Sequence, residues 1–75
     1  MSEFEVILPI KVEGVVEQLI EGRNMQLQDA LEYLYSSQLY SLLECEETKI
    51  WYYSPQMLLY LLDNEKNTGK LKLPQ

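Results

Sequence analysis

Residues 54–65 read Ser-Pro-Gln-Met-Leu-Leu-Tyr-Leu-Leu-Asp-Asn-Glu, and this stretch decides the fold. Serine followed by proline is typical of a helix start, because the serine side chain can cap free N–H groups and proline suits the first helical position. Gly69 is the expected end of the helix, and the positive charge of Lys66 in the last turn interacts favourably with the helix dipole. The pattern therefore predicts a final helix that begins at Pro55.

Six successive apolar residues, 57–62, make more than one face of this helix hydrophobic. Leu59 and Tyr60 lie on the two flanks of the expected core face. That core face comprises Met57, Leu58, Leu61 and Leu62. A helix that is apolar nearly all round is normally buried, and 75 residues offer little protein to bury it. We therefore expect a second chain to cover part of this helix.

Two further stretches carry apolar residues at helical spacing. The first predicts a helix over 11–22 that presents Val12, Val15, Val16, Leu19 and Ile20 to the core. The second predicts a helix over 27–35 that presents Leu27, Ala30, Leu31, Leu34 and Tyr35. Beyond Ser36-Ser37 the apolar positions lose this register, so a break is expected there, followed by a short helix over 38–44.

The expected fold class is therefore all-α: a compact bundle of three to four short helices in a single domain, residues 1–75. Short extended arms are expected at both ends of the chain. Phe4, Val6 and Leu8 alternate with other residues before Pro9, which itself suits a first helical turn or the segment before it. The tail 70–74 alternates lysine and leucine before its proline.

The size of the chain limits how it can be stabilised. An 8.9 kDa chain removes about 60% of its unfolded surface on folding, and ordering it costs about 1.5 kcal/mol per residue. One cysteine cannot form an intrachain disulfide, and without histidine no structural zinc site can be assembled. Self-association is the expected remaining means of stabilisation, unless helix packing suffices alone.

Composition also disfavours catalysis. The chain has no histidine to serve as a base, and Cys45 lies among glutamates, whose negative charge disfavours a reactive thiolate. Gly14, Gly22 and Gly69 stand alone, so no phosphate-binding glycine loop is present. We expect no enzyme activity, no cofactor, no metal and no small-molecule substrate. No stretch has the length of a membrane span, and the start of the sequence lacks a signal-peptide pattern, so a cytoplasmic protein is expected.

A DNA-binding regulator is the alternative interpretation. The helix, turn and short helix between residues 27 and 44 loosely resemble a helix-turn-helix motif. The second helix would present Gln38, Ser41 and Glu44, with no cation to meet phosphates. With 12 acidic and 6 basic residues, the formal net charge is −6, which disfavours nucleic acid and favours a protein partner.

Aromatic residues supply the positive functional signal, because tyrosine and tryptophan are enriched at interaction hot spots. Six tyrosines and one tryptophan are many for this length. The interface is predicted to use residues off the apolar arcs together with the aromatic segment and the last helix. These are Tyr33, Tyr40, Trp51, Tyr52, Leu59 and Tyr60. The sequence leaves open whether the partner is a second copy or another protein.

A set of short motifs between residues 11 and 66 carries a family resemblance. The motifs are Tyr35-Ser36-Ser37, Leu42-Leu43, Thr48-Lys49-Ile50-Trp51, Ser54-Pro55, and Tyr60 through Leu62 to Glu65. In this pattern the chain resembles a small family of uncharacterised bacterial proteins, a domain of unknown function associated with toxin–antitoxin-like genes. The resemblance implies a helical, antitoxin-like protein that binds a partner, and it implies no catalysis.

Overall fold

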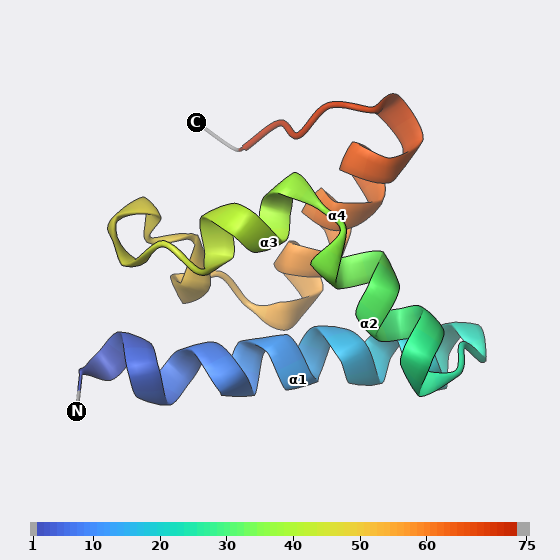
Figure 1. Cartoon of the computed structure of the whole chain (residues 1–75), viewed down its shortest axis with the longest axis horizontal. Coiled ribbons are helices and arrows are strands. Elements are labelled where there is room, and N and C mark those ends of the chain that lie inside the picture. Colours follow the sequence, from blue (N-terminus) through green and yellow to red (C-terminus); the bar gives the residue numbers. More distant parts are fainter. Residues whose placement is uncertain (1, 74–75) are drawn as a thin grey trace.

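The computed structural model describes residues 2–73, which form helices joined by short turns (Figure 1). The α-helices are α1 (Glu3–Arg23), α2 (Leu27–Tyr35), α3 (Gln38–Leu43) and α4 (Pro55–Thr68). Two single turns of 3₁₀ helix lie between α3 and α4: η1 (Glu46–Thr48) and η2 (Ile50–Tyr52). Helix α1 runs along one edge, and the other helices pack on one side of it. The predicted all-α bundle is confirmed.

Local capping signals set both ends of α4 as predicted, and the predicted break separates α2 from α3. The Ser54 hydroxyl oxygen accepts a hydrogen bond from the Met57 N–H at 3.1 Å, and Gly69 ends α4 with a φ of 79°. The chain breaks at the two serines between α2 and α3. There the Ser37 hydroxyl oxygen caps α3 by accepting from the Tyr40 N–H at 3.0 Å.

Helix α1 begins well before its predicted start, so the expected extended N-terminal arm is wrong. The segment 3–10 is helical, and Pro9 lies inside the helix instead of at its first turn. An interior proline costs about 3 kcal/mol, because it lacks an N–H and crowds the preceding turn. Burial offsets this cost: Phe4 packs edge-on against Trp51 with ring centroids 5.3 Å apart, and Ile7 and Leu8 pack against the same core.

The core lies between α1 and the other helices and is formed by residues of one chain. Its buried apolar residues are Val15, Val16, Leu19, Ala30, Leu34, Leu39, Leu43, Ile50, Trp51, Leu58, Leu61 and Leu62. The accessible surface is 4961 Å², close to the ~4,800 Å² that size scaling gives for a monomer of this mass. Leu58, Leu61 and Leu62 of α4 are enclosed within one chain, whereas Tyr60 on its flank is 60% exposed. The expectation that a second chain covers part of this helix stays a prediction.

One flank of α1 holds the segment that leads into α4. The Lys11 ammonium group donates to the Tyr53 carbonyl oxygen at 2.8 Å, and the Gln18 amide donates to the Pro55 carbonyl oxygen at 2.9 Å. Gly14 lies between these two contacts, and a Cβ built on it would stand 2.7 Å from the Pro55 ring. A larger residue would separate the two helices at this crossing.

We expect Gly14→Ala to lower the free energy of unfolding by about 1–2 kcal/mol, because overpacking against the proline ring exceeds the gain in helix propensity. Gly22→Ala is the matched control in the same helix, since a Cβ there meets nothing within 4 Å. The free energy of unfolding of Gly22→Ala should rise by about 0.5 kcal/mol, because alanine has the higher helix propensity. Urea unfolding of both variants checks the pair, and equal gains in the two would contradict the close approach at Gly14.

Candidate interaction surface

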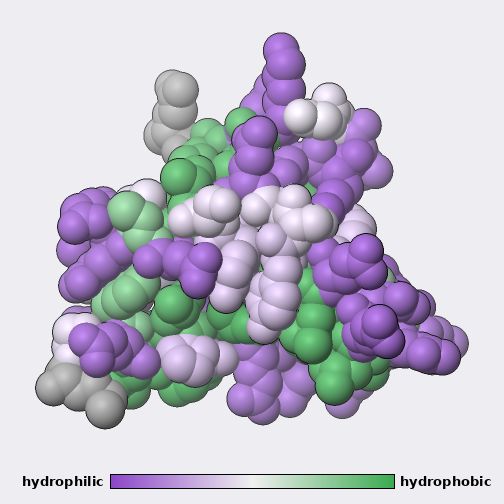
Figure 2. Space-filling model, viewed as in Figure 1, coloured by the Kyte–Doolittle hydropathy of each residue, from purple (hydrophilic) through white to green (hydrophobic). Residues whose placement is uncertain are grey.

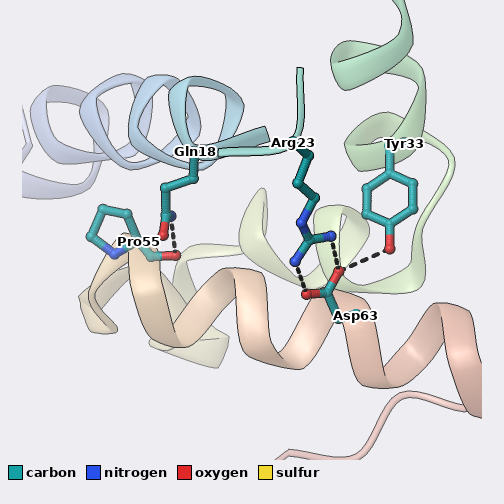
Figure 3. A network of polar contacts seen from close by, with 5 residues as sticks. All are labelled: Gln18, Arg23, Tyr33, Pro55 and Asp63. Atoms are coloured by element: carbon teal, nitrogen blue, oxygen red, sulfur yellow. Dashed lines mark hydrogen bonds and ion pairs between the residues drawn. The ribbon is translucent and has the colours of Figure 1, made fainter. Parts of the chain in front are cut away.

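A polar network joins three helices at the end of α1 (Figure 3). The Asp63 carboxylate of α4 accepts hydrogen bonds from both terminal nitrogens of the Arg23 guanidinium, at the end of α1. The Tyr33 hydroxyl of α2 donates to the same carboxylate at 2.9 Å. The Lys66 ammonium group lies 5.0 Å from the centre of the Tyr33 ring and donates to the Ser36 hydroxyl at 2.8 Å.

The protonation states of this network suit a structural tie. The hydrogen bonds from the Arg23 guanidinium lower the pKa of Asp63, and this effect exceeds the opposing effect of burial, which raises it. The Asp63 carboxylate therefore stays ionised. Burial, followed by the hydrogen bond to Asp63, raises the pKa of Tyr33 and keeps its hydroxyl neutral. Neither group is therefore poised to exchange a proton near neutral pH.

We expect Asp63→Asn to cost about 1 kcal/mol at pH 7, because the partners are 43% and 24% exposed and solvent screens the pair. Because folding lowers the pKa of Asp63, its contribution to the free energy of unfolding is complete at pH values above 3.8, the usual pKa of an aspartate. That contribution is lost as pH falls through the pKa of Asp63 in the folded protein. The difference between wild type and variant should therefore shrink towards pH ~2. Urea unfolding at both pH values measures this, and a pH-independent difference would contradict it.

A shallow groove lies between the end of α1 and α4. It is lined by Gln18, Glu21, Gly22, Arg23 and Leu59, with a volume of about 450 Å³. The groove is open to solvent, and Arg23 on its wall is already paired with Asp63. Its lining therefore offers an apolar contact at Leu59 and polar walls, without a nucleophile and base in reach of each other.

Helices α2 and α3 form the pair that the DNA-binding alternative requires. Gln38, Ser41 and Glu44 are exposed, as that interpretation expects. The start of α3, however, is occupied by the buried Glu65 carboxylate of α4. Its two oxygens accept from the Gln38 N–H at 2.8 Å and the Leu39 N–H at 3.0 Å. The N–H groups that could meet a phosphate are thus already bonded within the chain, so this geometry gives the alternative no support.

The structure separates the six predicted interface residues. The prediction that Trp51 lies at a surface is wrong, because its side chain is 1% exposed and lies in the core. Its indole N–H donates to the Glu46 carbonyl oxygen at 2.9 Å. Tyr52 and Tyr60 are exposed at 51% and 60%. The remaining three are half-buried and pack against the core: Tyr33, Tyr40 and Leu59.

The half-buried tyrosines are also partly engaged with neighbouring groups. Tyr40 packs against Tyr35 with ring centroids 4.7 Å apart. Burial, with the nearby Glu44 carboxylate, raises the pKa of Tyr40. Its ring therefore belongs to the α2–α3 junction, and the exposed partner of the pair, Tyr35, was expected to face the core.

The sequence patterns missed an exposed apolar pair on α1. Val6 and Ile10 are 49% and 61% exposed, and they lie one helical turn apart on the solvent side of α1. The two-residue alternation around Val6 suggested an extended arm. The four-residue spacing of Phe4, Leu8 and Val12 was the signal that could have placed the segment in a helix and Val6 outside the core.

The described residues 2–73 hold no group of three or more histidine, cysteine or acidic side chains placed to bind a metal ion. Within the same residues, no helix combines the length and the apolar character needed to cross a membrane. Cys45 is exposed, and its thiol donates to the Glu47 carboxylate at 3.1 Å, which lowers the pKa of that carboxyl group. The chain matches no family model, no curated protein and no solved structure.

Proposed function

We propose that this protein is a non-enzymatic interaction module that binds a protein partner through apolar and aromatic side chains on its surface. One observation carries the proposal: the monomer completes its core and still leaves large apolar side chains exposed. In the described residues these are Val6, Ile10, Leu27, Tyr35, Tyr52, Tyr60 and Leu73. Single exposed apolar residues are ordinary, but apolar groups one turn apart on one helix are typical of a binding surface.

The character of the exposed side chains supports a protein as the partner. Tyr52 stacks on Trp51 with ring centroids 4.2 Å apart, so its ring is held in place before any partner arrives. A rigid aromatic side chain loses little conformational entropy on binding, which is why tyrosine is frequent at interaction hot spots. The formal charge of −6 further favours a protein with basic groups over nucleic acid.

The proposal is tested by sedimentation of the purified protein and by quantitative capture from an extract of its source cells. Wild type is compared with Tyr52→Ser, Tyr60→Ser and Ile10→Ser, which alter exposed positions and should keep the helical circular dichroism. We expect either a dimer or a captured protein in stoichiometric amount, with at least one variant reducing it by about tenfold. A monomer that retains no protein in stoichiometric amount would overturn the proposal.

A further inference from the structure

The solvent side of α1 combines an apolar half with an acidic half. Steps of three or four residues lead along it from the exposed apolar pair to three exposed glutamates. We name this row the outer face of α1: Val6, Ile10, Glu13, Glu17 and Glu21. It spans about 22 Å at the rise of an α-helix. In Figure 2, small apolar patches are visible at the lower left among hydrophilic surface, and hydrophilic side chains project below the middle of α1.

None of the glutamates of this face forms an ion pair with another residue in the range 2–73. Within residues 2–73, the one ion pair joins Arg23 to Asp63, on the side of α1 that faces α4. Lys11, the other cation of α1, is engaged beside the start of α4, where it donates to the Tyr53 carbonyl oxygen. Like charges four residues apart destabilise a helix by a few tenths of a kcal/mol per pair, so the row carries a small uncompensated repulsion.

We infer that the outer face of α1 binds a basic amphipathic helix of a partner protein. Apolar side chains of that helix cover Val6 and Ile10, and lysine or arginine residues one turn apart pair with Glu13, Glu17 and Glu21. A helix of about 15 residues matches the length of the face. The inference rests on the proposed function and gives it a site and a partner chemistry.

Charge decides between this occupant and a second copy of the chain. A two-fold interface places the same residues on both sides of the contact. A second copy would therefore bring a second row of Glu13, Glu17 and Glu21, with no cation on either face to pair with them. A basic helix instead removes the repulsion within the row and covers the apolar pair at the same time.

The test uses a synthetic helical peptide of about 18 residues, long enough to form a helix on binding. It carries two leucines one turn apart, then three lysines one turn apart on the same side, with alanine elsewhere. Binding to the full-length protein is measured by fluorescence anisotropy. A peptide with glutamate in place of lysine is the negative control. We expect the lysine peptide to bind, to weaken with added salt, and the glutamate peptide not to bind.

Matched variants distinguish binding at the outer face of α1 from a response to the net charge of the protein. The triple variant Glu13→Gln, Glu17→Gln, Glu21→Gln should weaken binding by about tenfold or more. The control triple variant removes the same charge from exposed positions after α3: Glu44→Gln, Glu46→Gln and Glu47→Gln. It should weaken binding by less than about threefold, since it changes the long-range field alone. Likewise Ile10→Ser should weaken binding and Leu27→Ser, of similar exposure, should not.

Three results would overturn the inference. The first is that the lysine peptide fails to bind. The second is equal weakening by both triple variants, which would mean that the peptide responds to net charge. The third is a dimer that Ile10→Ser dissociates, which would place a second copy on the face. Each of these results leaves the proposed function standing if the captured partner or the dimer depends on another exposed residue, such as Tyr60. Absence of both dimer and stoichiometric partner would remove the proposed function itself.

Discussion

Trp51→Ala should lower the free energy of unfolding by about 3–5 kcal/mol, a large part of the stability of a domain this small. The indole is 1% exposed and lies against Phe4, so truncation opens a cavity at the contact between η2 and the start of α1. It also leaves the Glu46 carbonyl oxygen without the indole N–H that donates to it. Urea unfolding followed by far-ultraviolet circular dichroism measures the loss without relying on tryptophan emission.

Two comparisons sharpen this expectation. Trp51→Phe keeps most of the ring volume and should lose about 1–2 kcal/mol. Tyr52→Ala removes the neighbouring ring, which is 51% exposed, and should cost less than about 1 kcal/mol. If Trp51→Ala and Tyr52→Ala cost the same, the placement of Trp51 in the core is wrong.

Glu65→Ala should cost about 3 kcal/mol, the second of the large effects. Both carboxylate oxygens accept backbone N–H groups at the start of α3, and hydrogen bonds to a charged group contribute about 1.5–3 kcal/mol each. Removal leaves the Gln38 and Leu39 N–H groups without acceptors, and the second of these is buried. Thermal and urea unfolding at pH 7 both report the loss.

The neighbouring residue provides the control. Lys66→Ala removes an exposed side chain of the same helix and its hydrogen bond to the Ser36 hydroxyl, at a cost of about 0.5 kcal/mol. Glu65→Gln keeps one acceptor oxygen and should fall between the two. A Glu65→Ala variant within 0.5 kcal/mol of Lys66→Ala would show that α3 starts without help from α4.

The elements that could be predicted are those whose signals are adjacent in the sequence. Ser54, Pro55 and Gly69 determine the two ends of α4 through local hydrogen bonds and backbone conformation. The break between α2 and α3 was likewise visible, because the apolar register changes at two consecutive serines. Such features need no knowledge of what the helix packs against.

The features that could not be predicted depend on residues far apart in the chain. The alternation of Phe4, Val6 and Leu8 predicts an extended arm, and Pro9 is expected at or before the first helical turn. In the structure the cost of Pro9 inside α1 is offset by the contact of Phe4 with Trp51, which lies 47 positions later. No residue near Glu65 in the sequence indicates that it caps another helix, and its role appears when α4 crosses the start of α3. The burial of Trp51 follows from the same tertiary contacts, since propensity alone places an aromatic residue equally well in a core or an interface.

The proline inside α1 also bears on the order in which the chain folds. Pro9 has no N–H to donate to the Glu5 carbonyl, so the first two turns of α1 are weakly linked to the rest of their own helix. They are held instead by Trp51, which is synthesised much later. A nascent chain that ends before η2 therefore lacks what stabilises these turns. In the folded protein, backbone amides of residues 3–8 should exchange with solvent through local opening, well before those of the buried middle of α1.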